Sequence, residues 1–425
     1  MFEININKLI RMQIFLIYRI VYEVVYHHVV SDVFGYAGLK YNPNITKMII
    51  SYGIFIAFIF ISRDYSKVSG FLLDIHFIFT IIPLLAMYWQ SDRSTSYILA
   101  CSVCYFILNT VCYTKNVKKT KIITLGNFFS KFNITKYLMV ATILILIILT
   151  SIYGIATNIA FDMASVYSLR ASQSFPGILG YLINWLPYSI VPCLLCITLY
   201  KKNYIGSVLS ILCQTYLYLL TGSKTTFFSI GLILFSYWLV KCKKNFVLWW
   251  CIALTVLNIV TPIIYNKFGQ LMPLAIFPVR LLTLPADISN LHFEFFSNHS
   301  KLLFSENFIG RIFGIKSPYN MLASFIIGGT NSNANTGYLG DAFDNAGIPL
   351  MLIYSVILGL ILRYIDKIYH TVKEVSGEGI LPVFVGILTY NMIYLNDGSL
   401  TAVLITGGLL INIFVLMQMF KMEHR

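Results

Sequence analysis

Twelve apolar stretches of membrane-spanning length constrain this chain more than any other feature of its sequence. They cover residues 12–30, 45–62, 71–90, 95–113, 136–157, 178–199, 204–220, 225–240, 246–265, 346–365, 380–395 and 400–420. A helix of about 20 apolar residues crosses the hydrocarbon core of a bilayer. Only 11% of the 425 residues are charged, whereas soluble domains carry roughly 25%. The sequence therefore predicts an all-α polytopic membrane protein with a single integral membrane domain over residues 1–425.

The distribution of Lys and Arg predicts the orientation. With a cytoplasmic N-terminus, twenty of the 31 basic residues lie in inner segments and ten in outer ones, and Arg19 lies within the first stretch. Five of the outer ten belong to one long loop, where the positive-inside rule has less force. We therefore predict about twelve transmembrane helices with both termini in the cytoplasm. The net charge of +14 follows from these loops, and no basic face interleaved with aromatic residues predicts nucleic-acid binding.

The eight cysteines lie inside or at the edge of apolar stretches. Cys101 and Cys104, and likewise Cys193 and Cys196, have the CxxC spacing of some metal and redox sites. Neither pair is followed by a second pair of ligands, so we expect these side chains to pack as small apolar groups between helices. We predict no disulfide, no metal site and no cofactor.

Residues 266–345 form the longest predicted connection, an outer loop that mixes aromatic residues, prolines and charges. Long connections without regular structure are usually functional. Within this loop Ile288, Leu291 and Phe295 share one helical face, which predicts short amphipathic helices lying at the membrane surface over a cavity. The alternative is a plain tether between two membrane spans.

Cations on the predicted outer side are the first candidates for chemistry. Arg170 lies in an outer loop, Lys224 in the turn TGSK, and Arg280 and Arg311 in the long loop. Arg binds phosphate through a planar fork of donors, and Lys supplies a point charge. Converging cations would stabilise a diphosphate leaving group. Alternatively, each side chain simply extends to lipid phosphates.

Histidines supply the candidate general bases. His292 and His299 lie in the long loop near Glu294, and a histidine titrates near neutral pH. A surface position without any role is the alternative for each. Other ionisable residues lie inside predicted spans, where they either bond one another or line a substrate groove: Arg19, Glu23, His27, His28, Asp74 and His76.

A polar run over residues 328–347 ends the long loop. It contains Asn335, Tyr338, Asp341 and Asp344 among several glycines. Gly and Asn favour tight turns, and the same amides, phenol and carboxylates would also bind a hydroxyl-rich ligand. Composition alone does not choose between the two interpretations.

The segment NSNANTGYLGDAFDNAGIPLMLIYSVILGLILRYID, residues 331–366, resembles the end of the large periplasmic loop and the following helix of O-antigen polymerases. The shared pattern is Asn, Thr-Gly, Leu-Gly, an aromatic residue, and Gly before an apolar helix that ends in Asp. Tyr-Ser-Leu-Arg at 167–170 and Thr-Gly-Ser-Lys at 221–224 are weaker echoes. The number of spans and the position of the long loop are also similar to that family.

The resemblance implies a metal-independent glycosyltransferase of the bacterial inner membrane, working at its periplasmic face. Donor and acceptor would be oligosaccharides linked to undecaprenyl diphosphate, with membrane lipids and a chain-length regulator as further partners. Arg170, Arg280 and Lys224 would hold the donor diphosphate, and His299 or His292 would accept the acceptor hydroxyl proton. The remaining candidates for substrate binding are Arg311, Asn335, Tyr338 and Asp341.

Two other activities stay open from sequence alone. An O-antigen ligase would share the topology and transfer the glycan to a lipid core. A flippase for lipid-linked oligosaccharides also has roughly twelve spans, but it does not need a late, asymmetric outer loop of this length.

Overall fold

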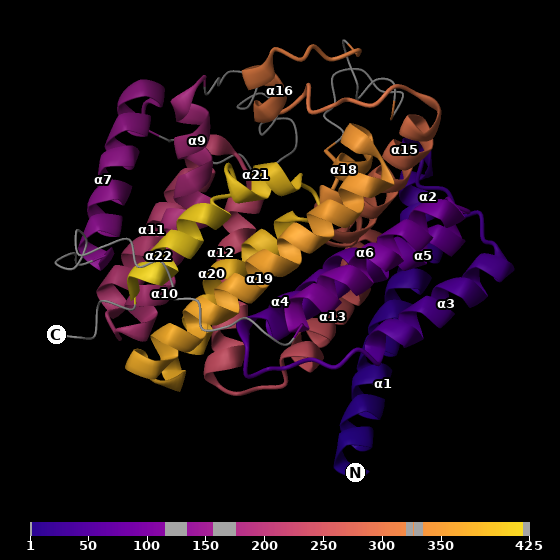
Figure 1. The fold of residues 1–425 in the computed structure, drawn as a ribbon, viewed down its shortest axis with the longest axis horizontal. Coiled ribbons are helices and arrows are strands. Elements are labelled where there is room, and N and C mark those ends of the chain that lie inside the picture. Colours follow the sequence, from indigo (N-terminus) through magenta and orange to yellow (C-terminus); the bar gives the residue numbers. More distant parts are fainter. Residues whose placement is uncertain (1, 115–133, 156–175, 320–325, 327–334, 420–425) are drawn as a thin grey trace.

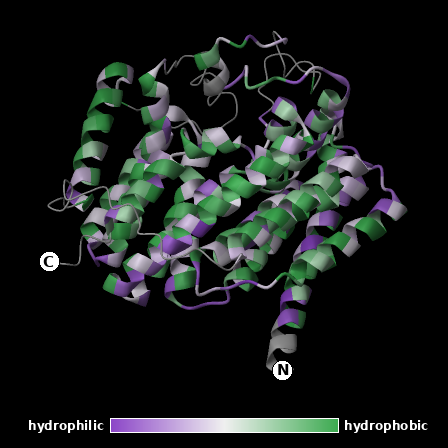
Figure 2. Cartoon of the chain, viewed as in Figure 1, coloured by the Kyte–Doolittle hydropathy of each residue, from purple (hydrophilic) through white to green (hydrophobic). Residues whose placement is uncertain are grey.

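The computed structural model describes residues 2–114, 134–155, 176–319, 326 and 335–419, and every regular element within these ranges is a helix. Long helices lie side by side in a bundle, and short helices gather over one end of it (Figure 1). Hydrophobic residues predominate along the long helices, and hydrophilic ones concentrate toward helix ends and connections (Figure 2).

The first part of the bundle is built from long helices with short connections. Its elements are α1 (Phe2–Val25), η1 (Tyr26–Val30), α2 (Ser31–Phe34), η2 (Gly35–Ala37), α3 (Ile45–Ile59), α4 (Val68–His76), η3 (Phe77–Ile81), α5 (Ile82–Gln90), α6 (Thr95–Tyr113) and α7 (Ile134–Tyr153). Asn44 and Ser94 cap α3 and α6, because each side chain accepts a hydrogen bond from a backbone N–H of the first turn. Polar capping residues therefore mark where these apolar helices begin.

The second part continues the bundle and adds the short helices at one end. Its elements are α9 (Ile178–Trp185), η5 (Leu186–Ile190), α10 (Val191–Tyr200), α11 (Tyr204–Thr221), α12 (Lys224–Lys241), α13 (Phe246–Phe268), α14 (Leu271–Leu274), η6 (Ala275–Thr283), α15 (Leu284–Asn298), α16 (Phe308–Phe313), α18 (Tyr338–Ala346), α19 (Ile348–Ser376), η7 (Glu378–Ile380), α20 (Leu381–Tyr394), α21 (Leu400–Leu404) and α22 (Leu409–Met419).

Nine helical stretches in the described part of the chain are long and apolar enough to cross a membrane: Val68–Gln90, Thr95–Tyr113, Ile134–Tyr153, Ile178–Tyr200, Tyr204–Thr221, Phe246–Phe268, Leu271–Asn298, Ile348–Ser376 and Leu400–Met419. Two shorter apolar helices, Ile45–Ile59 and Glu378–Tyr394, accompany them. The prediction of an all-α polytopic membrane protein is thereby confirmed in its coarse form. Eight of the nine stretches coincide with predicted spans, and Leu271–Asn298 does not.

The stretch Leu271–Asn298 is the main difference from the predicted fold. We expected short amphipathic helices in residues 266–345, but 28 consecutive residues, Leu271–Asn298, are helical. Pro278 lies inside the π-helical segment η6, and Pro285 lies in the first turn of α15. The wider turns of a π-helix depart from the regular hydrogen-bond ladder, so a residue without an N–H is tolerated there.

Both ends of this stretch lie at the same end of the bundle. Near its start, the Nζ of Lys224 at the beginning of α12 lies 3.2 Å from the Sδ of Met272. Farther along the stretch, Arg93, which follows α5, contacts Asp287 at 2.5 Å and Glu294 at 3.5 Å. We call this the loop end of the bundle, where α5 ends and α12 begins. The opposite end, where α1 and α4 begin, is the N-terminal end.

The ionisable residues of the first span bond one another. Arg19 is fully buried, and its guanidinium donates to Glu23 of the same helix (2.8 Å) and to the hydroxyl of Ser51 (2.6 Å). Glu23 also accepts hydrogen bonds from the hydroxyl of Tyr52 (2.6 Å) and the indole of Trp89 (2.9 Å). A buried charge is tolerated when it is paired and hydrogen-bonded, so these residues hold α1, α3 and α5 together.

Candidate functional site

The candidate site is built around the turn Leu395–Ser399, which joins α20 to α21 at the loop end. The side-chain amide of Asn396 donates to the backbone oxygen of Leu281 in η6 (3.2 Å). The backbone N–H of Tyr338, the first residue of α18, donates to the backbone oxygen of Leu395 (3.1 Å). The turn therefore joins the start of the long predicted loop to the polar run that ends it.

Arg280 and Asp397 form the charged centre of this site. Arg280 lies on η6 one residue before Leu281, is exposed, and acts electrostatically on Asp397 in the turn. Asp397 is exposed in the turn, but the protein groups around its carboxyl partly desolvate it and raise its pKa to about 6, while Arg280 acts in the opposite direction. A carboxyl with a pKa near 6 is ionised at neutral pH and is basic enough to accept a proton.

Three tyrosines stack beside this turn. The rings of Tyr188 in η5 and Tyr390 in α20 are parallel with centroids 4.5 Å apart, and Tyr394 lies 5.8 Å from Tyr390. The Tyr188 hydroxyl is within 3.3 Å of the hydroxyl of Thr226 in the first turn of α12. Gly398 in the turn packs against the Tyr394 ring so closely that an added Cβ would lie 2.7 Å from it. The stack thus fixes the position of the turn that carries Asp397.

Lys224 lies on the same side of the site as η6. Besides the contact of its Nζ with Met272, the ring of Phe228 one helical turn later contacts that of Phe277 in η6, with centroids 5.3 Å apart. The start of α12 therefore runs alongside η6 up to three residues before Arg280. Lys224 itself contacts the start of the helical stretch that carries Arg280, eight residues before that arginine.

His292 belongs to a second polar cluster, between α15 and α18. Its Nδ1 lies 2.5 Å from Oδ2 of Asp344, and both side chains are 3% exposed. Burial raises the pKa of Asp344, and His292 and Lys301 act in the opposite direction. The pKa of Asp341 is raised to about 7, first by burial and then by the neighbouring Asp344. Asp341 and His292 are both candidate site residues, and they come from distant parts of the predicted loop. The structure places them in the same polar cluster.

The two predicted histidines lie away from the charged centre. His292 follows Arg280 by 12 residues on one continuous helix, a separation of about 18 Å at about 1.5 Å per residue, and its ring is buried against Asp344. His299 is exposed just beyond this helix, where its ring stacks on that of Phe295 with centroids 4.0 Å apart. Arg280 and either histidine therefore occupy different parts of the loop end.

The other predicted site residues are dispersed. Tyr338 is buried with its hydroxyl 3.2 Å from Nε2 of His76, so it packs into the bundle, and Asn335 is exposed just before α18. Arg170 lies outside the described residues. Arg311 belongs to α16, but its side chain lies outside the described part of the molecule.

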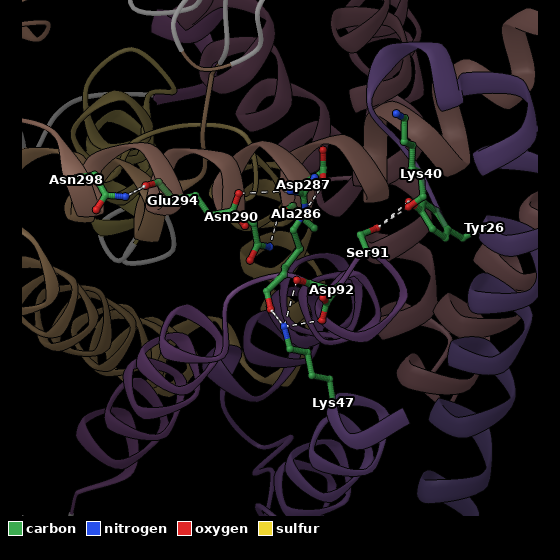
Figure 3. A network of polar contacts seen from close by, with 11 residues as sticks. Tyr26, Lys40, Lys47, Ser91, Asp92, Ala286, Asp287, Asn290, Glu294 and Asn298 are labelled. Atoms are coloured by element: carbon green, nitrogen blue, oxygen red, sulfur yellow. Dashed lines mark hydrogen bonds and ion pairs between the residues drawn. The ribbon is translucent and has the colours of Figure 1, made fainter. Parts of the chain in front are cut away.

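Arg93 and Asp397 were not among the residues predicted from the sequence. The Arg93 guanidinium contacts Asp287 at 2.5 Å and Glu294 at 3.5 Å, and Figure 3 shows both carboxylates on α15 near the Lys47–Asp92 pair. It therefore ties α15 to the end of α5. The motif NDGS between two apolar stretches is the signal that would have singled out Asp397, because it predicts a polar turn at the loop end.

The glycines of the 331–366 segment have packing roles. A Cβ on Gly337 would lie 2.6 Å from the backbone oxygen of Asn396, so only glycine lets α18 approach the turn. A Cβ on Gly359 of α19 would lie 2.9 Å from the side chain of Val111 on α6. Asp366, near the end of the same segment, accepts hydrogen bonds from the backbone N–H (2.9 Å) and hydroxyl (2.6 Å) of Ser69. Gly337 therefore shapes the site, whereas Gly359 and Asp366 pack α19 against α6 and α4 near the N-terminal end.

We expect Gly337→Ala to destabilise the protein by about 1–3 kcal/mol, because the added methyl group collides with backbone that cannot rotate away. Thermal unfolding of the purified protein in detergent measures this effect. Gly231→Ala on α12 is the matched control, since a Cβ there meets nothing within 4 Å. Equal melting temperatures for the two variants would contradict the close approach of α18 to the turn.

Within the described residues no group of three or more His, Cys, Asp or Glu side chains is placed to hold a metal ion. The comparisons with known proteins add no relative: no family model matches the chain, and no curated protein or solved structure matches it. The fold and the site define the class as a polytopic α-helical membrane protein with a charged, aromatic site at its loop end.

Proposed function

We propose that this protein polymerises undecaprenyl-diphosphate-linked oligosaccharide repeat units, as O-antigen polymerases do. The observation that carries the proposal is the electrostatic interaction of Arg280 with Asp397 at the loop end. A cation for the leaving diphosphate and a carboxylate for the acceptor proton are the two groups that glycosyl transfer from a lipid diphosphate needs. The resemblance of residues 331–366 to that family supplies the identity of the substrates.

In the proposed reaction an acceptor hydroxyl attacks the anomeric carbon of the donor chain. Asp397 accepts the hydroxyl proton as the new C–O bond forms. The bond between the anomeric carbon and the diphosphate breaks, and its electron pair leaves with the diphosphate. Arg280 and Lys224 stabilise the negative charge that develops on the leaving group.

The base in this reaction differs from the one that the sequence favours. His292 and His299 lie beyond Arg280 on the same helical stretch or just after it, whereas Asp397 is within the electrostatic reach of Arg280. The pairing of His292 with Asp344 supports a different role, the attachment of α18 to α15. The substrate-binding assignments of Arg311, Asn335, Tyr338 and Asp341, and the diphosphate-binding assignment of Arg170, stay predictions.

The proposal includes a location. The loop end would face the periplasm from the bacterial inner membrane, and both termini would lie in the cytoplasm. Aromatic side chains such as those of Tyr188 and Tyr394, partly exposed beside Asp397, suit contacts with sugar rings near the reacting centre.

Cells that lack the gene are expected to show lipopolysaccharide with core plus a single repeat unit, since ligation continues without polymerisation. An electrophoretic ladder of extracted lipopolysaccharide measures this result, with the gene restored from a plasmid as the control. Loss of all glycan from the core would contradict polymerisation and indicate a ligase or a flippase. Long polymer retained on undecaprenyl diphosphate would select the ligase.

A further inference from the structure

The last membrane-spanning stretch, Leu400–Met419, is interrupted just beyond the candidate site. Residues 405–408, between α21 and α22, are not helical, and we call them the α21–α22 break. Gly408 at its end has a φ of +70°, in the left-handed region, and a Cβ there would lie 2.5 Å from Cβ of Ser189 in η5. The Ser189 hydroxyl donates to the backbone oxygen of Gly408 (3.3 Å). Only glycine therefore fits at this position.

Two further side chains bond the backbone of the break. The indole of Trp185 in α9 donates to the backbone oxygen of Ile405 (2.7 Å). The side-chain amide of Asn391 in α20 donates to the backbone oxygen of Gly407 (2.8 Å). Backbone groups that an interrupted helix frees inside a bilayer are costly unless they find such partners. Because side chains from separate helices supply these partners, the break is a specific feature of the fold.

Asn391 is itself held at both ends of its amide. It is 1% exposed, and its Oδ1 accepts a hydrogen bond from Nδ2 of Asn412 in α22 (2.7 Å). The Oδ1 of Asn412 in turn accepts from the hydroxyl of Ser189 (2.6 Å). An amide has a donor end and an acceptor end, so these contacts allow Asn391 a single orientation.

The hydrogen bond from Asn391 to Gly407 closes a loop of the chain. The two residues are 16 positions apart, and the segment between them comprises the end of α20, the turn of the candidate site and α21. The ring of Tyr394 fills the space inside this closed loop. A Cβ on Gly398 in the turn would lie 2.7 Å from one edge of the ring, and a Cβ on Gly407 would lie 2.9 Å from the other. The break therefore contacts the turn through the Tyr394 ring.

We propose that Asn391 is a positioning residue, which holds the Asp397 carboxyl where Arg280 acts on it. The inference rests on the proposed function, because Asp397 is the proton acceptor of that reaction. Asn391 is buried in α20 with both ends of its amide bonded to the protein. It therefore acts through the closed loop, which fixes the turn, and makes no contact with the substrate.

The closed loop also limits how much water reaches the Asp397 carboxyl. Among the described residues, the groups that face this carboxyl are Arg280 on η6 and the phenols of Tyr390 and Tyr394 on α20. Partial desolvation raises its pKa to about 6, and Arg280 acts in the opposite direction. Opening the loop would hydrate the carboxyl and return its pKa toward the ordinary aspartate value of about 3.9. Without Asn391, Asp397 is thus expected to be a weaker base that stays ionised at lower pH.

The test compares Asn391→Leu with Asn258→Leu, in which a buried amide of α13 that donates to its own helix is replaced in the same way. We expect Asn391→Leu to lower kcat at neutral pH by about 10-fold to 100-fold, with little change in KM for the lipid-linked substrate. The pH of half-maximal rate should move from about 6 toward about 4. Asn258→Leu should keep the wild-type pH of half-maximal rate, even where it lowers the melting temperature.

A second pair of variants tests the same loop without removing a hydrogen bond, and it decides the matter if Asn391→Leu does not fold. Gly407→Ala pushes the added methyl group against the Tyr394 ring. Gly359→Ala is its matched control, since its methyl group collides with Val111 on α6 instead. We expect the acid shift in Gly407→Ala and the wild-type profile in Gly359→Ala. An unchanged pH of half-maximal rate in the folded loop variants would overturn the positioning role.

A titration without substrate separates this inference from the proposed function. The Asp397 carboxyl is followed by infrared spectroscopy of protein labelled with ¹³C-aspartate, and Asp397→Asn identifies its band. We expect titration near pH 6 in the wild-type protein and about one to two pH units lower in Asn391→Leu and Gly407→Ala. Identical titrations would refute the positioning role even in a protein that polymerises. A wild-type protein that fails to polymerise would refute the proposed function, while the titration still decides whether Asn391 positions Asp397.

Discussion

Asp397→Asn is expected to slow polymerisation by at least about 100-fold, because the amide cannot accept the proton of the acceptor hydroxyl. The variant keeps the size of the side chain, so the stack of Tyr188, Tyr390 and Tyr394 and the turn itself are expected to stay in place. The measurement is the rate at which purified protein converts lipid-linked repeat units into polymer. The wild-type rate should also fall as the pH drops below about 6, where the Asp397 carboxyl becomes protonated.

Two controls make this result specific. Asp92→Asn changes a carboxylate at the same end of the bundle, where it pairs with Lys47 at 2.8 Å, and should leave the rate unchanged. His292→Gln tests the base that the sequence favours and should retain polymerisation once its effect on stability is subtracted. A fully active Asp397→Asn protein together with an inactive but folded His292→Gln protein would reverse the assignment of the base.

Arg280→Ala is expected to have an effect of similar size, a loss of about 100-fold to 1,000-fold in the rate of polymerisation. The substitution removes the positive charge that would stabilise the negative charge developing on the leaving diphosphate. Arg280→Lys should recover part of this loss, because an ammonium supplies the charge without the planar fork. The same in vitro assay measures both variants, and thermal unfolding checks their folding.

Lys267→Ala is the matched control for Arg280, since Lys267 is an exposed cation at the loop end, near the end of α13. It should have little effect on the rate. Combining Arg280→Ala with Asp397→Asn should cost less than the two single losses together, because both act on one transition state. Independent, additive losses would mean that the two residues do not share a reacting centre.

Hydropathy predicted most of the bundle, because a helix in lipid must satisfy its own backbone and be apolar over its whole length. The stretch Leu271–Asn298 was not predicted as one helix, since its mixture of aromatic residues, prolines and charges was interpreted as a long outer loop with short amphipathic helices. Its π-helical segment η6 accommodates Pro278, and helix propensities do not anticipate such a segment.

The candidate site was predictable only in part. The sequence singled out Lys224 and Arg280 because basic residues are less common on the predicted outer side of the membrane. Such a residue can be identified from the sequence without knowing which group it contacts. Asp397 lies 117 residues after Arg280 in a five-residue turn, and only the fold brings the two together. In the 331–366 segment, Gly337 and Asp366 serve packing and hydrogen bonding. A resemblance carried by such residues therefore reflects the arrangement of helices as much as chemistry.

The buried pair of Arg19 and Glu23 has a consequence for how the chain enters a bilayer. The two charges lie four residues apart on one helix, so they neutralise each other as soon as α1 forms. The helix α1 would therefore enter the membrane with this pair neutralised at its centre. The hydroxyls of Ser51 and Tyr52 arrive with the next apolar helix, α3, and the indole of Trp89 follows with α5. Synthesis order thus matches the order in which these polar groups find their partners.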